Sequence, residues 1–326
     1  MILRMNRRTL FKAGAAGALA LSAPQIMVRA AQADMPKPEV ENPGFNRFTL
    51  GEFEITTLRD GLRPGDGPYP PFGANQPAEE VAALLEANFL PADRFVNGFT
   101  PTLVNTGSEL ILFDTGIGEG GREGGLGQTR GQLETSGYKP EDVTIVVITH
   151  FHGDHIGGLT EGGQPAFPNA RYVTGQAEYD FWTAPERMSG ATENAAKTVE
   201  AKVKPFAEKT TFIGDGDDVV TGVTGMAAPG HTPGHMIFRL QSGGRQLVLT
   251  ADTANHYVAS IQRPDWHVAF DTDKDQGAAT RQKVLGMIAD EKLPFIGYHM
   301  PWPSLGYVER MDGGFRWVAA SYQMML

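Results

Sequence analysis

Cysteine is absent from the 326-residue chain. Its absence excludes disulfide bonds, cysteine-ligated zinc, iron–sulfur clusters and thiol nucleophiles. Long hydrophobic runs are missing too. Beyond the N-terminal region, no stretch of about 20 uninterrupted apolar residues occurs, so we expect no membrane span. With 41% hydrophobic and 20% charged residues, the composition is that of a globular protein and argues against disorder.

The N-terminal region has the layout of an export signal. Arg7 and Arg8 precede a stretch rich in alanine and glycine, residues 13–23, and the small-residue pattern Ala31-Gln32-Ala33 follows. This order resembles a twin-arginine signal peptide, residues 1–33, with cleavage after Ala33. We therefore expect a periplasmic or secreted protein, with an ordinary Sec signal as the alternative.

Removing this signal makes the chain strongly acidic. Residues 1–33 contain five basic and no acidic residues, so 23 Lys and Arg remain against 38 Asp and Glu, a net charge of −15. Such a surface repels phosphate backbones, and we expect no nucleic-acid partner. A small neutral or hydrophobic substrate fits this charge better.

The proline-rich residues 34–47 are predicted to form an N-terminal arm, and residues 48–326 a single domain. Short β-type runs bounded by Gly, Asp or Pro occur at Phe53–Leu58, Thr102–Asn105, Leu110–Phe113, Thr144–Thr149, Ala170–Val173, Val223–Ala228, Met236–Leu240, Leu247–Thr250 and Pro294–Tyr298. Helical patterns lie at Ala78–Phe89, Gln176–Trp182, Glu193–Phe206 and Gln276–Asp290. This order predicts two packed sheets with helices outside.

The chemistry centres on the run from His150 to His155. The apolar strand Ile145–Ile148 leads into it, and His150 and His152, two residues apart in extended backbone, point the same way. Gly153 then allows a sharp turn that returns Asp154 and His155 toward the same volume. Three imidazoles and a carboxylate within six residues are typical of a site for zinc, iron or nickel.

Further candidate ligands follow strand-like segments downstream. They are one of the two histidines in Pro229-Gly230-His231-Thr232-Pro233-Gly234-His235, then Asp252 and His299. A lone aspartate at a strand end is more often a cap or turn residue, and a lone histidine is more often structural. Taken singly, these three positions are weaker indications than the first motif.

Together these motifs resemble the metallo-β-lactamase superfamily, whose H-x-H-x-D-H motif is matched without departure. The resemblance covers residues 48–326 and implies an α/β fold, a four-layer αββα sandwich. It also implies two divalent metal ions, with zinc expected and manganese, cobalt or iron as alternatives. The implied ligands are His150, His152 and His231 for one metal, Asp154, His155 and His299 for the other, and Asp252 between both.

The resemblance further implies a hydrolytic mechanism in which a hydroxide bridging the metals attacks the substrate. Asp252 and Asp154 would be the catalytic carboxylates. Asp114, which ends the strand Leu110–Phe113, would support the metal-binding loop without binding metal.

The branch of the superfamily bears on the substrate. His155 is present and cysteine is absent, which argues against a true β-lactamase. The chain most resembles methyl parathion hydrolase and the related lactonases and arylesterases, which implies a lactone, aryl ester or phosphotriester substrate. Within that resemblance, Trp182 is similar to an aromatic wall of the substrate pocket. An anchor holding its helix to the core is the alternative.

Two departures leave the substrate open. The loop Ile117–Gly127 lacks the aromatic residue that phosphotriesterase relatives have there, and Asn255 stands where many lactonases have a tyrosine. Contact with substrate stays open for Trp182, Tyr257, His256 and His267. A structural role is favoured for His235, His256 and His267.

Two other activities occur on this fold. One is an iron-dependent oxidoreductase of the persulfide dioxygenase type, and the other is a nuclease, which the acidic net charge disfavours. Because related hydrolases are often dimers, we also expect a homodimer.

Overall fold

The first strand begins inside the predicted arm. In this computed structural model, which describes residues 43–322, β1 (Phe45–Leu50) already belongs to a large sheet. The signal predicted at residues 1–33 and residues 34–42 of the arm lie outside the described residues.

The first sheet has seven strands in the order β1-β2-β5-β6-β7-β10-β11. Its antiparallel half runs from β1 to β6, and β6, β7, β10 and β11 are parallel neighbours. The strands after β1 are β2 (Phe53–Leu58), β5 (Thr102–Asn105), β6 (Leu110–Phe113), β7 (Ile145–Ile148), β10 (Arg171–Gly175) and β11 (Thr210–Ile213).

The second sheet also has seven strands, in chain order from β12 to β18. All neighbours are antiparallel except β15 and β16. The strands are β12 (Asp218–Val220), β13 (Val223–Ala227), β14 (Met236–Ser242), β15 (Arg245–Ala251), β16 (Phe295–Gly297), β17 (Leu305–Met311) and β18 (Gly314–Ala319).

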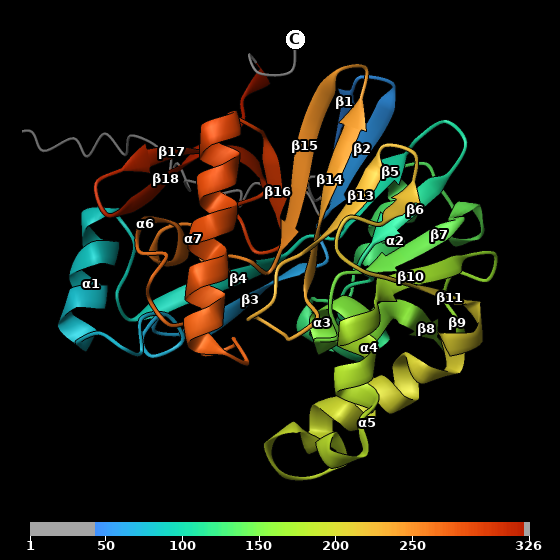
Figure 1. The fold of residues 1–326 in the computed structure, drawn as a ribbon, viewed down its shortest axis with the longest axis horizontal. Helices are drawn as coiled ribbons and strands as arrows, with labels where there is room; N and C mark the ends of the chain where they lie inside the picture. Colours follow the sequence, from blue (N-terminus) through green and yellow to red (C-terminus); the bar gives the residue numbers. More distant parts are fainter. Residues whose placement is uncertain (1–42, 323–326) are drawn as a thin grey trace, which may run out of the picture. The chain divides into compact units, whose positions relative to one another are not determined.

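Helices cover the outer faces of both sheets (Figure 1). The helices are α1 (Ala78–Ala87), α2 (Thr129–Thr135), α3 (Gly153–Ile156), α4 (Gln176–Thr183), α5 (Glu193–Lys202), α6 (Ala259–Gln262) and α7 (Lys274–Glu291). Helices α2, α4 and α5 contribute to a core on the first sheet, and α7 packs on the second. Short 3-10 helices lie at Glu119–Gly124, Pro140–Asp142, Gly157–Leu159, Pro185–Met188, Gly190–Thr192 and Lys204–Lys209.

Strand β7 shows how the layers arise from the sequence. Ile145 and Val147 point into the core between the two sheets, while Val146 and Ile148 point into the core under the helices. Because side chains alternate along a strand, a strand covered on both faces is apolar throughout. This packing confirms the expected αββα sandwich.

Three antiparallel strand pairs escaped the sequence analysis. In β17–β18, Asp312 and Gly313 form the connection, and Gly313 has a φ of 80°. An Asp-Gly pair is a hairpin signal that could have located it. The second is the separate two-stranded β3 (Gly61–Asp66) and β4 (Arg94–Phe99), where Pro64 and Gly65 interrupt the strand pattern.

The third pair is the short hairpin of β8 (Thr160–Glu161) and β9 (Gln164–Pro165). No helix within residues 43–322 is long and apolar enough to cross a membrane.

Candidate metal centre and active-site cavity

The metal-binding motif lies where β7 ends at the edge of the first sheet. His150 follows the strand, and His152 is the N-cap residue of the short helix α3, which carries Asp154 and His155. His150 and His155 are fully buried, whereas His152 and Asp154 are partly exposed. The turn into α3 therefore folds four polar side chains toward one volume, as the sequence predicted.

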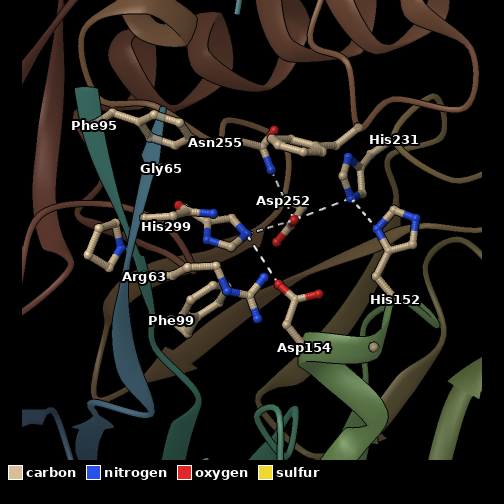
Figure 2. A pocket seen from close by; sticks show the side chains of 14 residues that line it. Arg63, Gly65, Phe95, Phe99, His152, Asp154, His231, Asp252, Asn255 and His299 are labelled. Atoms are coloured by element: carbon tan, nitrogen blue, oxygen red, sulfur yellow. Dashed lines mark hydrogen bonds and ion pairs between the residues drawn. The ribbon is translucent and has the colours of Figure 1, made fainter. Parts of the chain in front are cut away.

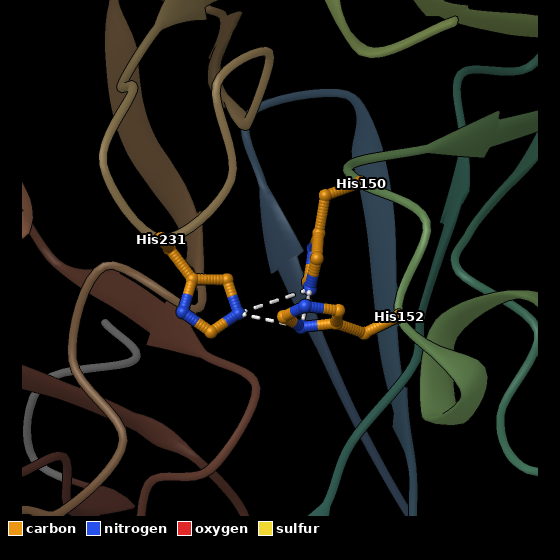
Figure 3. A group of neighbouring side chains, drawn as sticks. All are labelled: His150, His152 and His231. Carbon is orange, nitrogen blue, oxygen red and sulfur yellow. Dashed lines mark hydrogen bonds between the residues drawn. The ribbon is translucent and has the colours of Figure 1, made fainter. Parts of the chain in front are cut away.

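Three imidazoles meet at the first of two donor groups (Figure 3). His231 Nε2 lies 2.9 Å from His152 Nδ1 and 3.2 Å from His150 Nε2. The distance from His150 Nε2 to His152 Nδ1 is 3.1 Å. His231 comes from the loop between β13 and β14, 79 residues from His152. Tertiary folding selects it over His235.

The second donor group adjoins the first through Asp252, which follows β15. The Asp252 carboxylate lies 3.0 Å from His299 Nε2, 3.2 Å from His155 Nε2 and 3.2 Å from His231 Nε2. Asp154 Oδ2 lies 3.6 Å from His155 Nε2 and 3.7 Å from His299 Nε2. The structure thus brings all seven predicted ligands together.

These residues fit a pair of divalent cations. His155 Nε2 and Asp252 Oδ1 are buried, yet neither makes a hydrogen bond of suitable geometry. Buried polar atoms without partners are costly, and converging lone pairs repel one another. Neutral imidazole nitrogens and carboxylate oxygens are a donor set typical of zinc and of iron, manganese or cobalt. Cations between them would resolve both problems.

Electrostatics prepare three of these side chains, His150, His152 and Asp252, as ligands. Burial, reinforced by neighbouring histidines, lowers the pKa of His152 to about 3 and that of His150 well below its usual value. Burial alone would raise the pKa of Asp252, but the adjacent His299 and His155 lower it well below its usual range. His150 and His152 are therefore neutral and Asp252 ionised at neutral pH, the forms that bind metal.

Asp114 orients one ligand, in the position the resemblance implies. Its carboxylate accepts a hydrogen bond from His155 Nδ1 at 2.8 Å and two from Thr149, from the backbone N–H and the hydroxyl, both at 2.9 Å. With Nδ1 protonated and held, the lone pair of His155 Nε2 faces the donor group.

Asp271 does the same for His231 and was missed by the sequence analysis. His231 Nδ1 donates to Asp271 Oδ1 at 2.9 Å, and the buried Arg281 on α7 donates to Asp271 Oδ2 at 2.7 Å. Arg281 also donates to the backbone oxygens of Thr253, Pro264 and Trp266. Asp271 lies 40 residues from His231, so no local pattern in the sequence connects them.

Glu178 on α4, also missed, joins the two histidine-bearing loops. It is fully buried and accepts hydrogen bonds from the backbone of Phe151 and Gly234, from the Thr232 hydroxyl and from Trp182 Nε1. Trp182 itself packs in the core under the helices and does not line the cavity described below. Its placement matches the anchoring alternative, with its ring centroid 6.3 Å from that of His152.

The remaining histidines have structural partners. His235 Nδ1 donates to Ala228 O, and its Nε2 accepts from the backbone N–H of Asp252. His256 Nδ1 accepts from the backbone at the start of α6 and its ring stacks on Tyr257, whereas His267 pairs with Asp275 at the surface. None of the residues Tyr257, His256 and His267 lines the cavity described below.

A cavity of about 480 Å³ opens onto the donor groups (Figure 2). One wall is the two-stranded sheet of β3 and β4, and another is the segment after Asp252. Its lining is Arg63, Pro64, Gly65, Phe95, Asn97, Phe99, His152, Gly153, Asp154, His231, Asp252, Asn255, Phe270 and His299. Asn255, in place of the tyrosine of many lactonases, donates to Asp252 Oδ2 at 3.0 Å.

The glycine-rich loop 117–127 packs against Phe99, one of the residues that line this cavity. The buried carboxylate of Asp60 accepts hydrogen bonds from the backbone N–H groups of Ile117, Gly127 and Thr129 and so holds the two ends of the loop together. Leu126 of this loop packs against Phe99. The ring centroids of Phe99 and His299 are 5.4 Å apart. An aromatic side chain therefore reaches the metal centre from β4, although the loop has none.

Comparison with known proteins decides the family. The sequence model of the metallo-β-lactamase superfamily matches residues 100–299. The chain belongs to the metallo-β-lactamase superfamily. This match spans the strands and loops that carry all seven candidate ligands, and it confirms the resemblance seen in the sequence.

Several members of the superfamily are similar to this chain. An N-acyl homoserine lactonase of Bacillus cereus is 26% identical over 166 residues, 51% of this chain and 60% of the lactonase. A probable metallo-hydrolase of Mycobacterium bovis is 31% identical over 47% of this chain and 56% of its own length. The matching segments thus span less than two thirds of these curated relatives.

Solved structures match over more of the chain. The dizinc quorum-quenching lactonase AidC, in complex with the product N-hexanoyl-L-homoserine, superimposes with a TM-score of 0.76 at 30% identity, covering 86% of this chain and 98% of AidC. The hydrolase AbOPH gives a TM-score of 0.78 at 26% identity, covering 87% and 99%. A two-metal site is thus supported by both the donor geometry and a dizinc neighbour.

Proposed function

We propose that this protein is a metal-dependent hydrolase with two divalent ions that opens the ester bond of lactones. The observation that carries the proposal is the cavity of about 480 Å³, whose floor is the paired donor groups and whose walls include Phe95, Phe99 and Phe270. A cavity of this size, with aromatic rings in its walls and the polar donor groups at its floor, suits a small ligand with an apolar part. The similarity to lactonases supports the same substrate class.

Four residues that line the cavity would each have a separate role in ester hydrolysis. Two bound divalent ions would supply Lewis acidity and a water of lowered pKa. Asp252 would take part in holding that water, and Asn255, donating to Asp252 Oδ2, fixes the carboxylate. Asp154, partly exposed at the cavity floor, is placed to hold a proton for the departing alkoxide. Phe99, edge-on to His299, limits access of water from that side.

The test is a hydrolysis panel of γ-lactones, aryl esters and phosphotriesters with protein loaded with zinc, manganese, cobalt or iron. We expect turnover of lactones above the other two classes and two metal ions per chain by elemental analysis. Stoichiometric iron with oxygen consumption, and no hydrolysis, would favour the oxidoreductase alternative instead. Cleavage of RNA or DNA would favour the nuclease.

We also propose that the protein is exported by the twin-arginine route and acts outside the cytoplasm as a homodimer. The pair Arg7-Arg8 followed by Ala31-Gln32-Ala33 supports export. Fractionation of cells expressing the wild type and an Arg7→Lys/Arg8→Lys variant should show the enzyme in the periplasm only for the wild type. Light scattering of the purified protein tests the dimer.

A further inference from the structure

Glu178, in the first turn of α4, lies between the two loops that carry the first donor group. That group consists of His150, His152 and His231. The Glu178 side chain is fully buried, and no ion pair to it occurs within residues 43–322. A carboxylate buried in this way is costly unless hydrogen bonds replace its lost hydration. Its hydrogen bonds therefore show which parts of the fold the carboxylate holds.

One carboxylate oxygen of Glu178 holds the loop with the first two histidines. Oε1 accepts a hydrogen bond at 2.8 Å from the backbone N–H of Phe151, the residue between His150 and His152. It accepts another at 2.8 Å from Nε1–H of Trp182. The Trp182 ring in turn packs edge-on against His152, with centroids 6.3 Å apart. Oε1 thus fixes both the backbone between two donors and the ring beside one of them.

The other carboxylate oxygen holds the loop with the third histidine. Oε2 accepts hydrogen bonds from the Thr232 hydroxyl at 2.6 Å and from the backbone N–H of Gly234 at 3.0 Å. Both residues follow His231 closely in the chain. The loop also packs directly on α4, because a Cβ added at Gly234 would lie only 2.0 Å from the backbone nitrogen of Glu178. Direct contact and hydrogen bonds therefore both hold this loop against α4.

The second donor group has supports of its own. Its members are Asp154, His155 and His299. The backbone oxygen of Asp154 accepts a hydrogen bond from the Tyr298 hydroxyl at 2.6 Å. His299 Nδ1 donates to the backbone oxygen of Gly98 at 2.8 Å. Within residues 43–322, none of the hydrogen bonds of Glu178 reaches this group or these two supports.

We propose that Glu178 is a positioning residue for the first of the two metal ions. Its carboxylate sets the spacing between the loop with His150 and His152 and the loop with His231, and so controls the affinity for that ion without changing the affinity for the second. The inference rests on the proposed two-metal hydrolase and deepens it, because it makes the binding of the two ions separable. Asp271 orients a single ring, whereas Glu178 holds two ligand loops together.

Glu178→Gln tests this role with cadmium as the probe. The variant keeps the shape of the side chain, but its amide nitrogen cannot accept the hydrogen bonds of one loop. Cadmium NMR in chelator-buffered cadmium solutions follows the filling of each site, and His152→Ala and His299→Ala assign the two signals. The free cadmium concentration that half-fills the first site should rise by about 10- to 100-fold, and that for the second site by less than about 3-fold.

Asp60→Asn is the matched control. Asp60 is also a fully buried carboxylate. It accepts four hydrogen bonds, from the backbone of Ile117, Gly127 and Thr129 and from the Thr129 hydroxyl. None of these donors belongs to a loop of the first donor group. This variant should lose thermal stability, as Glu178→Gln does, while half-filling of the first site changes by less than about 3-fold. Weakening as large as in Glu178→Gln would reflect a general loosening of the fold and would overturn the positioning role.

Thr232→Val is a milder second variant. It removes one donor to Glu178 Oε2 and keeps the branched shape, so half-filling of the first site should need about 3- to 10-fold more cadmium even if Glu178→Gln fails to fold. Equal weakening of both sites, or of neither, would refute the inference. No substrate enters these measurements. A protein whose first site depends on Glu178 in this way but which opens no lactone would keep the positioning role and lose the lactonase proposal.

Discussion

Replacing Arg281 with methionine should destabilise the folded protein by at least about 4 kcal/mol. The side chain is 1% exposed and donates to Asp271 Oδ2 at 2.7 Å and to three backbone oxygens between 2.9 and 3.0 Å. Removing one partner of a buried ion pair costs about 3–5 kcal/mol, because the other charge stays buried. Each carbonyl left without a donor adds about 1 kcal/mol or more, although these terms overlap.

A matched comparison is the ion pair of Arg310 with Asp290 of α7. Its side chains are 56% and 63% exposed, so Arg310→Met should lower the free energy of unfolding far less than Arg281→Met does. Urea unfolding of the zinc-loaded variants, followed by circular dichroism, measures both values. If the free energy of unfolding of Arg281→Met were within about 1 kcal/mol of the wild-type value, the hydrogen bonds of Arg281 to the segment from Thr253 to Asp271 would contribute little to stability, which would refute the prediction.

The same substitution should also weaken metal binding. Asp271 holds Nδ1 of His231 and is itself held by Arg281, and loss of such support lowers metal affinity by about 10- to 100-fold. The absorption spectrum of cobalt-substituted protein during titration reports the affinity. Unchanged titration curves would show that His231 is oriented without the Asp271–Arg281 pair.

Three further predictions concern the site and its supports. His152→Ala and Asp252→Ala should each lower turnover by more than about 100-fold with the fold retained, and wild-type activity in either would contradict the ligand assignment. Glu178→Gln should cost about 2 kcal/mol in unfolding experiments, because the amide nitrogen cannot accept two of the four hydrogen bonds that Glu178 receives; stability equal to wild type would show that the carboxylate is dispensable. Burial lowers the pKa of His256 to about 4 from 6.5, so the unfolded chain binds its proton first. The stability of wild type relative to His256→Asn should therefore fall by ~3 kcal/mol as the pH drops from 6.5 to 4; a pH-independent difference would refute this.

The metal centre was predictable because several of its ligands lie at the ends of apolar strands and because their motifs together resemble those of the superfamily. His150, Asp252 and His299 each follow a segment whose apolar pattern could be recognised, and strand ends meet at one edge of a sheet. The cavity wall formed by β3 and β4 was not predictable in this way. Pro64 and Gly65 break the alternation, and which face of a two-stranded sheet meets the cavity depends on what packs beside it.

The supports of the ligands were also beyond sequence reasoning, except for Asp114. Asp271 and Glu178 are ordinary acidic residues in their local contexts, and Trp182 could equally have faced a pocket or the core. Their roles follow from contacts across 40 and 54 residues of chain, such as His231 with Asp271 and Thr232 with Glu178. Periodicity reports only which face of an element is buried, not what it is buried against.

By itself, the sequence determined two packed sheets, the metal-binding run from His150 to His155 and the absence of any thiol chemistry, and its resemblance to the superfamily implied the other donors. The sheets, the His150–His155 run and the missing thiols follow from residue types and from the spacing of apolar residues, which are local properties. Only the tertiary structure showed that His231 lies among the donors while His235 bonds to the backbone, that Trp182 is a core residue and that the side chains of Arg63 and Asn97 line the cavity. Such choices depend on distances between segments far apart in the chain, which packing of the whole domain sets.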